Sequence, residues 1–318
     1  VDTTSLGRVL GEILIKTEEV LLLEKPDAVL VLGDTNSAIA LLMAKRMKIP
    51  TYHMEAGNRC FDANVPEEIN RKLVDHVADF NLVYTEHARR NLIREGLHSR
   101  FTYVTGSPMR EVLNMHMQAI SVSPVLTELG LKAKKYFIVS VHREENVDSK
   151  KSLSAVIECL KAVAVTYNLP VIVSTHPRTK KRVEALGESL DDLDIRFLAP
   201  FGFFDYNKLQ KESYCAISDS GTISEESAIL NFPAITLRTA IERPEALDKG
   251  SIILTGLEPE IVLNAIDIAV SEVADGFIRE IPEEYKVENT SMRVLKLIIG
   301  TTKLTNRWLG LEKFSRYD

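Results

Sequence analysis

The sequence predicts an α/β fold with two open parallel β-sheets. Short apolar runs alternate with amphipathic segments along most of the chain, and strands alternating with helices are typical of right-handed βαβ units. The alternation stops near residue 122 and then starts again. The chain has 318 residues, 45% of them hydrophobic, which is enough for about two domains with cores of their own.

The first half opens with an amphipathic helix that begins at Leu6. The all-apolar run Ala28–Leu32 follows Lys25-Pro26-Asp27 and predicts a strand buried on both faces of the sheet. The elements expected after it are a helix 37–47, a strand 51–54, a helix 66–77, a strand 81–84, a helix 86–95 and a strand 101–104.

The second half repeats the pattern after 117–122, a stretch without strong periodicity. Here the sequence predicts strands at 136–141, 171–174, 195–198, 214–217 and 234–237, and helices at 151–167 and 223–230. A last helix is expected from Ser291 to Trp308.

These elements predict an N-terminal domain over 1–118, a C-terminal nucleotide-binding domain over 119–290 and a helical segment over 291–318. Ligands of open parallel sheets bind at the carboxyl ends of the strands. The cleft between the two domains is therefore the expected active site.

Charge and composition exclude several classes of protein. The net charge of −6 and the pI near 5.8 argue against nucleic-acid binding or an anionic membrane surface. No apolar run approaches the roughly 18 residues that span a bilayer. Three cysteines without pairing spacing suit a reducing compartment, so we expect a cytoplasmic protein.

Polar residues gather where the N-terminal strands end. Asp34 follows the first strand and Glu55 the second, and Glu67 opens the next helix. Each has a simpler explanation: Asp34 could cap a helix, and Glu67 and Glu68 could be placed by the helix dipole. Together they indicate a site that carries out acid–base chemistry.

Polar residues also follow the C-terminal strands. His142 and Arg143 come after one strand, Ser220 and Gly221 precede a helix, and Arg243 lies further on. A helix N-terminus with Ser-Gly-Thr is a cap and also a cradle for a phosphate, and Arg243 is either a surface charge or a phosphate clamp. We expect this half to hold the anionic end of a ligand. His142 and His176 could equally be structural histidines.

Other common sites are missing from the sequence. There is no G-x-G-x-x-G, no G-K-[ST] and no metal-ligand spacing of Cys and His, which argues against dinucleotide, P-loop and zinc sites. The remaining histidines form no ligand pattern: His53, His76, His87, His98 and His116.

Six motifs, in order, resemble the non-hydrolysing bacterial UDP-N-acetylglucosamine 2-epimerases, over essentially the whole chain. They are Gly33-Asp34-Thr35, His53-Met54-Glu55-Ala56-Gly57, Pro66-Glu67-Glu68-Ile69-Asn70-Arg71, His142-Arg143-Glu144-Glu145-Asn146, Asp219-Ser220-Gly221 and Glu242-Arg243-Pro244-Glu245. The resemblance implies a two-Rossmann-domain, glycosyltransferase-B-like fold and a cytoplasmic homodimer. It also implies an opening βα unit ending in Gly-Thr-Arg-Pro-Glu, which this sequence lacks.

Three segments differ from the commonest members of that family and resemble one of its branches. That branch makes UDP-N-acetyl-L-fucosamine from UDP-2-acetamido-2,6-dideoxy-L-talose. The segments are Thr222 in Asp-Ser-Gly-Thr, the segment Gly106-Ser107-Pro108-Met109, and Arg59-Cys60-Phe61-Asp62. The substrate is therefore expected to be UDP-N-acetylglucosamine or this 6-deoxy sugar.

The resemblance also implies the chemistry: UDP is eliminated across C1–C2 and added back with inversion at C2, without metal or redox cofactor. By motif, Asp34, Glu55, Glu67 and His142 are the expected catalytic residues, and Ser220, Gly221, Glu226, Arg243, Arg71 and Arg143 the expected substrate-binding residues. Glu226 is suited to accept from ribose hydroxyls. Two alternatives remain: a UDP-sugar glycosyltransferase, and a non-catalytic nucleotide-sugar-binding protein.

Overall fold

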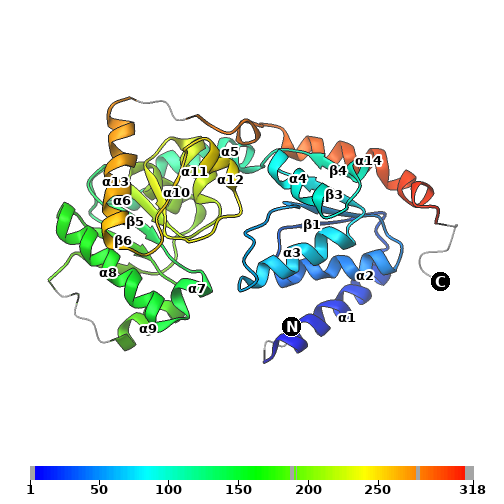
Figure 1. The fold of residues 1–318 in the computed structure, drawn as a ribbon, viewed down its shortest axis with the longest axis horizontal. Coiled ribbons are helices and arrows are strands. Elements are labelled where there is room, and N and C mark those ends of the chain that lie inside the picture. The colour runs from blue at the N-terminus through cyan, green and yellow to red at the C-terminus, as the bar shows by residue number, and fades with distance from the viewer. Residues whose placement is uncertain (1–3, 187–189, 191, 277–279, 312–318) are drawn as a thin grey trace. The chain divides into compact units, whose positions relative to one another are not determined.

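The computed structural model describes residues 4–186, 190, 192–276 and 280–311. The chain forms two compact units (Figure 1). Unit 1 comprises Val1–Pro108 and Val287–Asp318, and unit 2 comprises Met109–Lys286. The chain thus enters unit 2 ten residues before the boundary expected from the sequence, and its last helix belongs to unit 1.

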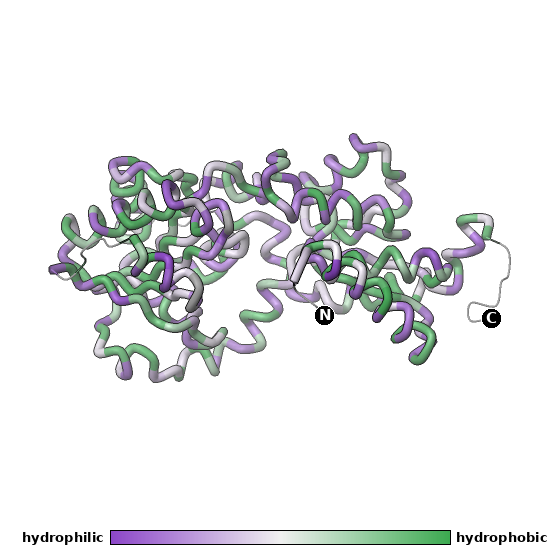
Figure 2. The backbone as a smooth tube through the Cα atoms, turned by 90° about the horizontal axis from the view of Figure 1, so that it is seen from below, coloured by the Kyte–Doolittle hydropathy of each residue, from purple (hydrophilic) through white to green (hydrophobic). Residues whose placement is uncertain are grey.

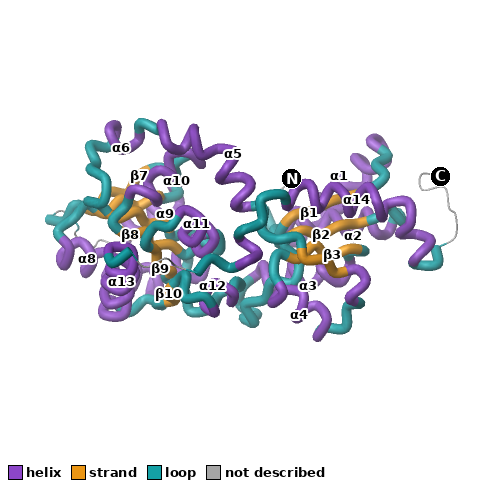
Figure 3. Tube along the Cα trace, turned by 90° about the horizontal axis from the view of Figure 1, so that it is seen from above, coloured by secondary structure: helices purple, strands orange, loops and turns teal. Residues whose placement is uncertain are grey.

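Unit 1 contains four parallel strands in the order β1-β2-β3-β4, with helices packed around them (Figure 3). Its elements are α1 (Leu6–Glu24), β1 (Val29–Leu32), η1 (Asn36–Ile39), α2 (Ala40–Arg46), β2 (Thr51–Met54), α3 (Pro66–Val77), β3 (Phe80–Val83), α4 (Glu86–Arg94), η2 (Ser99–Phe101), β4 (Thr102–Val104) and α14 (Thr290–Trp308).

Unit 2 contains six parallel strands in the order β10-β9-β8-β5-β6-β7. Its elements are α5 (Met109–Val122), α6 (Val125–Glu128), β5 (Phe137–Ser140), α7 (Glu144–Val147), α8 (Lys150–Tyr167), β6 (Val171–Ser174), α9 (Pro177–Leu186), β7 (Ile195–Leu198), α10 (Phe203–Glu212), β8 (Cys215–Ser218), α11 (Ile223–Leu230), β9 (Ala234–Thr236), α12 (Pro244–Asp248), β10 (Ile253–Leu254), α13 (Pro259–Ala274) and η3 (Glu283–Tyr285).

The order of strands in unit 2 reverses between β5 and β8. The chain builds β5, β6 and β7 in one direction and then returns to add β8, β9 and β10 on the other side. In such doubly wound sheets, ligands bind outside the carboxyl ends of the strands where the order reverses. The loops after β5 and β8 are therefore the favoured site within this unit.

The core of unit 2 covers both faces of its sheet. Along β5, Phe137 and Val139 pack into one apolar cluster, while Ile138 packs into another, and all three are fully buried. Successive strand residues point to opposite faces, so β5 is a central strand covered on both sides. The expected fold class, two Rossmann-like units with parallel sheets, is confirmed.

The prediction that the first strand is buried on both faces is wrong. Leu30 and Leu32 of β1 are 44% and 56% exposed. β1 is the outermost of the four strands that the structure describes, and only Val29 and Val31 pack into apolar clusters of unit 1. An all-apolar run does not reveal that one of its faces lies outside the core.

Several helices of the structure were not predicted from the sequence. The stretch 117–122 is the end of α5, whose Leu113 and Ile120 are fully buried. The other helices not expected include α9, α10 and α13. Many helices alternate between hydrophilic and hydrophobic residues along the tube, as amphipathic helices do (Figure 2).

The last helix, α14, packs on the sheet of unit 1. Its Val294 belongs to the same apolar cluster as Tyr52 and Phe80, and the Tyr52 hydroxyl lies 2.7 Å from Oγ1 of Thr301. Trp308 meets Phe80 edge to face, with ring centroids 6.4 Å apart. The last helix and the strands β2 and β3, which are far apart in the sequence, therefore build one core.

None of the described helices is both long and apolar enough to cross a membrane. The cysteines Cys60, Cys159 and Cys215 are free thiols, and all three are buried.

Candidate active site

Asp34 follows β1 and is held by α3 rather than by a helix cap. Its Oδ2 accepts from Nη2 of Arg71 at 2.6 Å and from Nε of the same guanidinium at 3.0 Å. The Asn70 side chain donates to the main-chain oxygen of Asp34 at 3.0 Å. The adjacent helix η1 begins after Thr35, without a side-chain cap bond. Arg71, expected to bind substrate, thus holds the Asp34 carboxylate.

Glu55 follows β2, the neighbour of β1, and its backbone is left-handed with φ of 64°. Its Oε2 lies 3.5 Å from where a Cβ on Gly33 would stand, and Gly33 itself has φ of 76°. A side chain at position 33 would be strained by this backbone conformation, and its Cβ would stand in van der Waals contact with the Glu55 carboxylate. The ends of β1 and β2 therefore bring Glu55 against the segment that carries Asp34.

Glu67 and Glu68 lie in the first turn of α3, after Pro66 at the first position. Glu68 is buried and accepts from the Cys60 main-chain N–H at 3.1 Å and from Nη1 of Arg71 at 2.8 Å. Burial alone would raise the pKa of Glu68, but these donors lower it. Glu67 is half-buried, one helical turn before Arg71, on the side of α3 that contacts Asp34.

In unit 2, Asp219 organises the loops after β5 and β8. This residue is fully buried, and its carboxylate accepts from the main-chain N–H groups of His142 and Arg143 at 3.0–3.1 Å. It also accepts from the Asn146 amide at 3.0 Å and lies 3.1 Å from Nδ1 of His142. One carboxylate therefore joins two strand ends at the reversal point of the sheet.

The Asp219–His142 contact changes the pKa of the histidine. The hydrogen bond from Asp219 raises the pKa of His142, although its partial burial opposes this. Burial alone would raise the pKa of Asp219, but the donors around it lower it. The contact therefore favours the protonated imidazole, and 57% of its side chain is exposed.

Two arginines lie beside Gly221. A Cβ at position 221 would stand 3.7 Å from Nη2 of Arg143 and 4.0 Å from Nε of Arg243. Arg243 donates to the Gly221 oxygen at 2.8 Å and pairs with Glu225 at 2.9 Å. Arg243 is only 5% exposed, which excludes a simple surface charge.

Ser220 and Glu226 have different surroundings. The Ser220 hydroxyl accepts from the Thr222 N–H at 3.3 Å, so it closes the turn before α11. Glu226 is buried in α11 and accepts from Gln210 at 2.7 Å, and burial raises its pKa. The structure thus gathers His142, Arg143, Ser220, Gly221 and Arg243 at one edge, while Glu226 is bound by Gln210 of α10.

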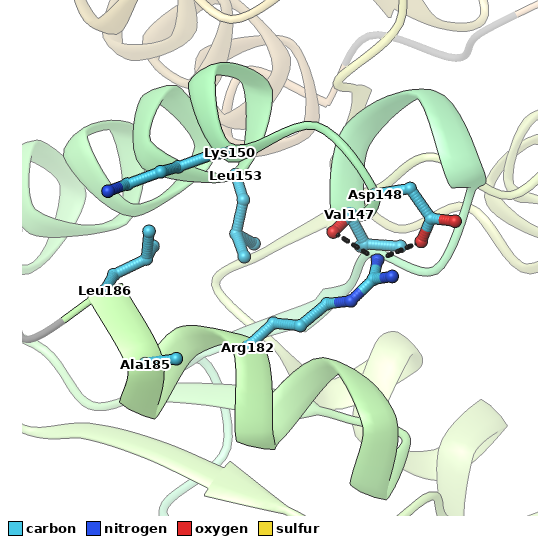
Figure 4. A pocket seen from close by; sticks show the side chains of 7 residues that line it. All are labelled: Val147, Asp148, Lys150, Leu153, Arg182, Ala185 and Leu186. Atoms are coloured by element: carbon cyan, nitrogen blue, oxygen red, sulfur yellow. Dashed lines mark hydrogen bonds and ion pairs between the residues drawn. The ribbon is translucent and has the colours of Figure 1, made fainter.

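A hollow of about 250 Å³ lies between α7, α8 and α9 of unit 2 (Figure 4). None of the expected site residues lines it. Arg182 reaches from α9 across the hollow and donates to the Val147 oxygen at 2.8 Å and to Asp148 (Figure 4). It ties α9 to the end of α7, the helix that carries Asn146.

The sequence did not point to a buried network in unit 1 that joins His53, Arg59, Asp75 and Glu95. Asp75 is fully buried, and Arg59 donates to it at 2.7 Å and to Glu95 at 2.7 Å through two nitrogens. The available signal was the helical spacing of Glu68, Arg71 and Asp75, which places three charged residues on one side of α3. Among the described residues, no group of three or more His, Cys, Asp or Glu side chains could hold a metal ion.

Comparison with known proteins identifies the family. The family model described as UDP-N-acetylglucosamine 2-epimerase matches residues 1–299. The chain belongs to the UDP-N-acetylglucosamine 2-epimerase family.

Relatives of the UDP-N-acetylglucosamine 2-epimerase family share the fold over most of their length. The chain is 37% identical to the UDP-N-acetylglucosamine 2-epimerase of Methanocaldococcus jannaschii over 279 residues, 84% of this chain and 75% of that protein. The Rickettsia bellii epimerase structure has a TM-score of 0.89 and 44% identity, covering 96% of this chain and 82% of that one. The M. jannaschii epimerase in complex with UDP-GlcNAc and UDP has a TM-score of 0.84 and 34% identity, covering 92% and 80%.

Proposed function

We propose that this protein inverts C2 of a UDP-2-acetamido sugar, converting UDP-N-acetylglucosamine into UDP-N-acetylmannosamine or acting on a close analogue. The observation that carries the proposal is the pair of clusters in a 2-epimerase family member: carboxylates at the ends of β1 and β2, and cationic groups at the reversal point of the sheet in unit 2. A UDP-sugar carries a group suited to each cluster. Its sugar ring must exchange a proton at C2, and its diphosphate carries negative charge.

The cationic cluster of unit 2 suits the diphosphate. His142 gains positive charge from Asp219, and Arg143 and Arg243 lie beside Gly221, where the absence of a side chain leaves room. Main-chain N–H groups at the start of α11 add partial positive charge. In this assignment Ser220, Gly221 and Glu226 contribute to the nucleotide site, and Glu226 faces the ribose.

The carboxylates of unit 1 suit proton transfer at the sugar. The C2 proton is not next to a carbonyl, so a free carbanion at C2 is too costly. In the proposed route one carboxylate among Asp34, Glu55 and Glu67 removes the C2 proton while the C1–O bond breaks. The C–H electron pair becomes the C1=C2 double bond, and UDP leaves with the C1–O electrons.

The second half of the reaction reverses these steps on the other face. UDP adds back to C1, and a carboxylic acid delivers a proton to the opposite face of C2. Positive groups around the diphosphate stabilise the leaving UDP.

Proton exchange in deuterium oxide tests the reaction. Incubated with UDP-N-acetylglucosamine alone, the protein should form the C2 epimer with deuterium at C2, as followed by proton NMR. A glycosyltransferase would need an acceptor, and a binding protein would give no exchange. Neither epimer nor deuterium with either candidate UDP-sugar would refute the proposal.

Asp34→Asn is the matched variant for this experiment. The loss of one carboxylate should abolish epimerisation yet leave the UDP dissociation constant within about tenfold, or roughly 1.4 kcal/mol, because the diphosphate cluster is intact. Near-wild-type turnover would remove Asp34 from the mechanism.

Oxygen-18 distinguishes elimination from a redox route. With the label in the oxygen that bridges C1 and phosphorus, elimination frees the diphosphate and should scramble the label into non-bridging positions. Oxidation at C3 through a bound nicotinamide would leave the bridging oxygen in place.

The alternative substrate is the 6-deoxy talose sugar of the fucosamine branch, which three local departures resemble: Thr222, Ser107-Pro108, and Arg59-Cys60-Phe61-Asp62. Comparison of kcat/KM for the two UDP-sugars tests this choice. A higher kcat/KM for UDP-N-acetylglucosamine would reject the 6-deoxy talose sugar as the natural substrate. The proposed inversion at C2 would still stand.

We further propose a cytoplasmic homodimer. The resemblance implies both, the three free buried thiols suit a reducing compartment, and exposed apolar residues such as Leu6 and Leu23 of α1 suit a protein contact. Light scattering measures the mass in solution, and fractionation of cells tests the location. A monomeric mass would reject the dimer.

A further inference from the structure

Glu68, in the first turn of α3, is the innermost member of a chain of three side chains in unit 1. Its side chain is 2% exposed, whereas Arg71 is 4% and Asp34 is 26% exposed. Oε2 of Glu68 accepts from Nη1 of Arg71 at 2.8 Å, and Nη2 of the same guanidinium donates to Oδ2 of Asp34 at 2.6 Å. The chain of contacts therefore runs outward from a buried carboxylate to a candidate catalytic one.

The shape of the guanidinium couples these two contacts. Nε and Nη2 of Arg71 both donate to Oδ2 of Asp34, and Nη1 donates to Glu68. A guanidinium holds its donors in one rigid plane, so the contact at Nη1 sets the direction of the edge that faces Asp34. Glu68 and Arg71 are three positions apart on α3, which makes them neighbours on its surface. Glu68 thus orients Asp34 through Arg71.

The same oxygen of Glu68 also anchors residues 55–65, which join β2 to α3 and are called here the Glu55 loop. Oε2 accepts from the Cys60 main-chain N–H at 3.1 Å, and the Cys60 thiol donates to it at 3.3 Å. The next residue, Phe61, has a left-handed φ of 57°, a conformation that a bulky residue keeps only where its neighbours are held. Two residues before Cys60, Asn58 donates to Oε1 of Glu55 at 3.4 Å.

We propose that Glu68 is a positioning residue, which holds Asp34 through Arg71 and holds the Glu55 loop through the Cys60 amide. Its effect on turnover rests on the proposed function. Its hold on the Cys60 amide does not, and can be measured in the protein without substrate.

Hydrogen exchange of the Cys60 amide, followed by NMR, tests the contact itself. In Glu68→Ala this amide loses its acceptor and should exchange at least about tenfold faster than in the wild type. In Glu68→Gln it should stay slow, because the side-chain amide oxygen can accept the same hydrogen. Fluorescence of Trp308, which contacts Phe80, shows whether unit 1 is folded in each variant. Equal exchange in the wild type and Glu68→Ala would overturn the proposal.

Kinetics of the same two variants test the positioning role. Glu68→Ala releases Arg71 and the Glu55 loop, so kcat should fall about ten- to hundredfold. Glu68→Gln keeps an oxygen for both donors and should stay within about threefold of the wild type. The UDP dissociation constant should change less than about twofold in both, because the proposed diphosphate cluster lies in unit 2. A lower melting temperature of Glu68→Ala with an unchanged kcat would refute positioning.

Glu68→Asp keeps the test decisive if Glu68→Ala does not fold. This variant retains a carboxylate that is one methylene shorter, so it cannot reach Cys60 and Arg71 together. Its kcat should fall about tenfold, below that of Glu68→Gln. A higher kcat for Glu68→Asp than for Glu68→Gln would show that charge matters rather than these contacts, and would refute the proposal.

Lys72→Ala is the matched control on the same helix. Nζ of Lys72 lies 3.4 Å from the other oxygen of Glu68, Oε1, and 49% of the lysine side chain is exposed. An exposed pair of this kind contributes little, so kcat and the exchange of the Cys60 amide should equal those of the wild type. If the wild type forms no C2 epimer, the proposed function fails and the effect on turnover with it, while exchange of the Cys60 amide still decides the contact.

Discussion

Arg243 and Glu225 form an ion pair inside unit 2. Their side chains are 6% and 2% exposed, so neither charge is solvated once its partner is gone. Arg243 neutralises Glu225, and in the proposed function it also attracts the diphosphate. Loss of a partner from such a pair costs about 3–5 kcal/mol.

Arg243→Ala should therefore lower the free energy of unfolding of unit 2 by about 3–5 kcal/mol, and weaken UDP binding by about 2–5 kcal/mol. Urea unfolding and calorimetry measure the two effects. The control is Lys249→Ala, whose partner Glu280 is exposed, and whose free energy of unfolding should equal that of the wild type. An unchanged UDP dissociation constant would remove Arg243 from the binding site.

The stability that His142 contributes should depend on pH. Contact with Asp219 raises its folded-state pKa above the ordinary 6.5. The contribution is then fully present below pH 6.5 and is lost as the pH rises through the folded-state pKa. The difference in unfolding free energy between wild type and His142→Gln should shrink over that window. A difference that grows with pH would show that the neutral ring is the stabilising form.

The sequence predicted some site residues and missed others for a physical reason. Asp34 and Glu55 follow apolar strands directly, so a parallel sheet forces them to one edge. Asp75 and His53 are neighbours only after α3 folds back on β2, and nothing in a single sequence reports that pairing. The motif that contains Arg71 does not reveal that its guanidinium contacts Asp34.

At the scale of elements, α14 is the segment whose packing the sequence could not predict. Its 3.6-residue periodicity predicts a helix, but not the partner that covers its apolar side. That partner is the sheet of unit 1, through Val294 and Trp308. The open face of β1 escaped prediction similarly, because burial of a strand depends on what lies beside it.

Val294→Ala should destabilise unit 1 by about 1.5–3 kcal/mol, from the loss of buried methyl groups and the space left behind. Trp308 is the protein's single tryptophan and touches Phe80, so its fluorescence during urea unfolding reports on unit 1. The neighbouring Leu295, 47% exposed, is the control, and Leu295→Ala should change stability by less than about 0.5 kcal/mol. Equal effects of the two variants would contradict the packing of α14.

At the scale of the whole molecule, the two units differ in continuity. Unit 2 is one uninterrupted segment, Met109–Lys286. Unit 1 joins two segments, Val1–Pro108 and Val287–Asp318. A fragment of residues 109–286 should therefore fold alone. A fragment of residues 1–108 should not, because Tyr52 and Phe80 would lose the helix that covers them.

Circular dichroism in urea compares three fragments. We expect a cooperative transition for 109–286, none for 1–108, and recovery when 1–108 is joined to 287–311 by a flexible linker. A cooperative transition of 1–108 alone would show that α14 is dispensable.

The return of α14 to unit 1 also sets the order of events during translation. The first four strands leave the ribosome early, but the helix that covers Tyr52 and Phe80 is made only after the whole of unit 2. At about 5–20 residues per second, this interval lasts roughly ten to forty seconds. During it the nascent chain displays an aromatic surface in a crowded cell, and a chaperone that binds apolar surfaces would find its target there.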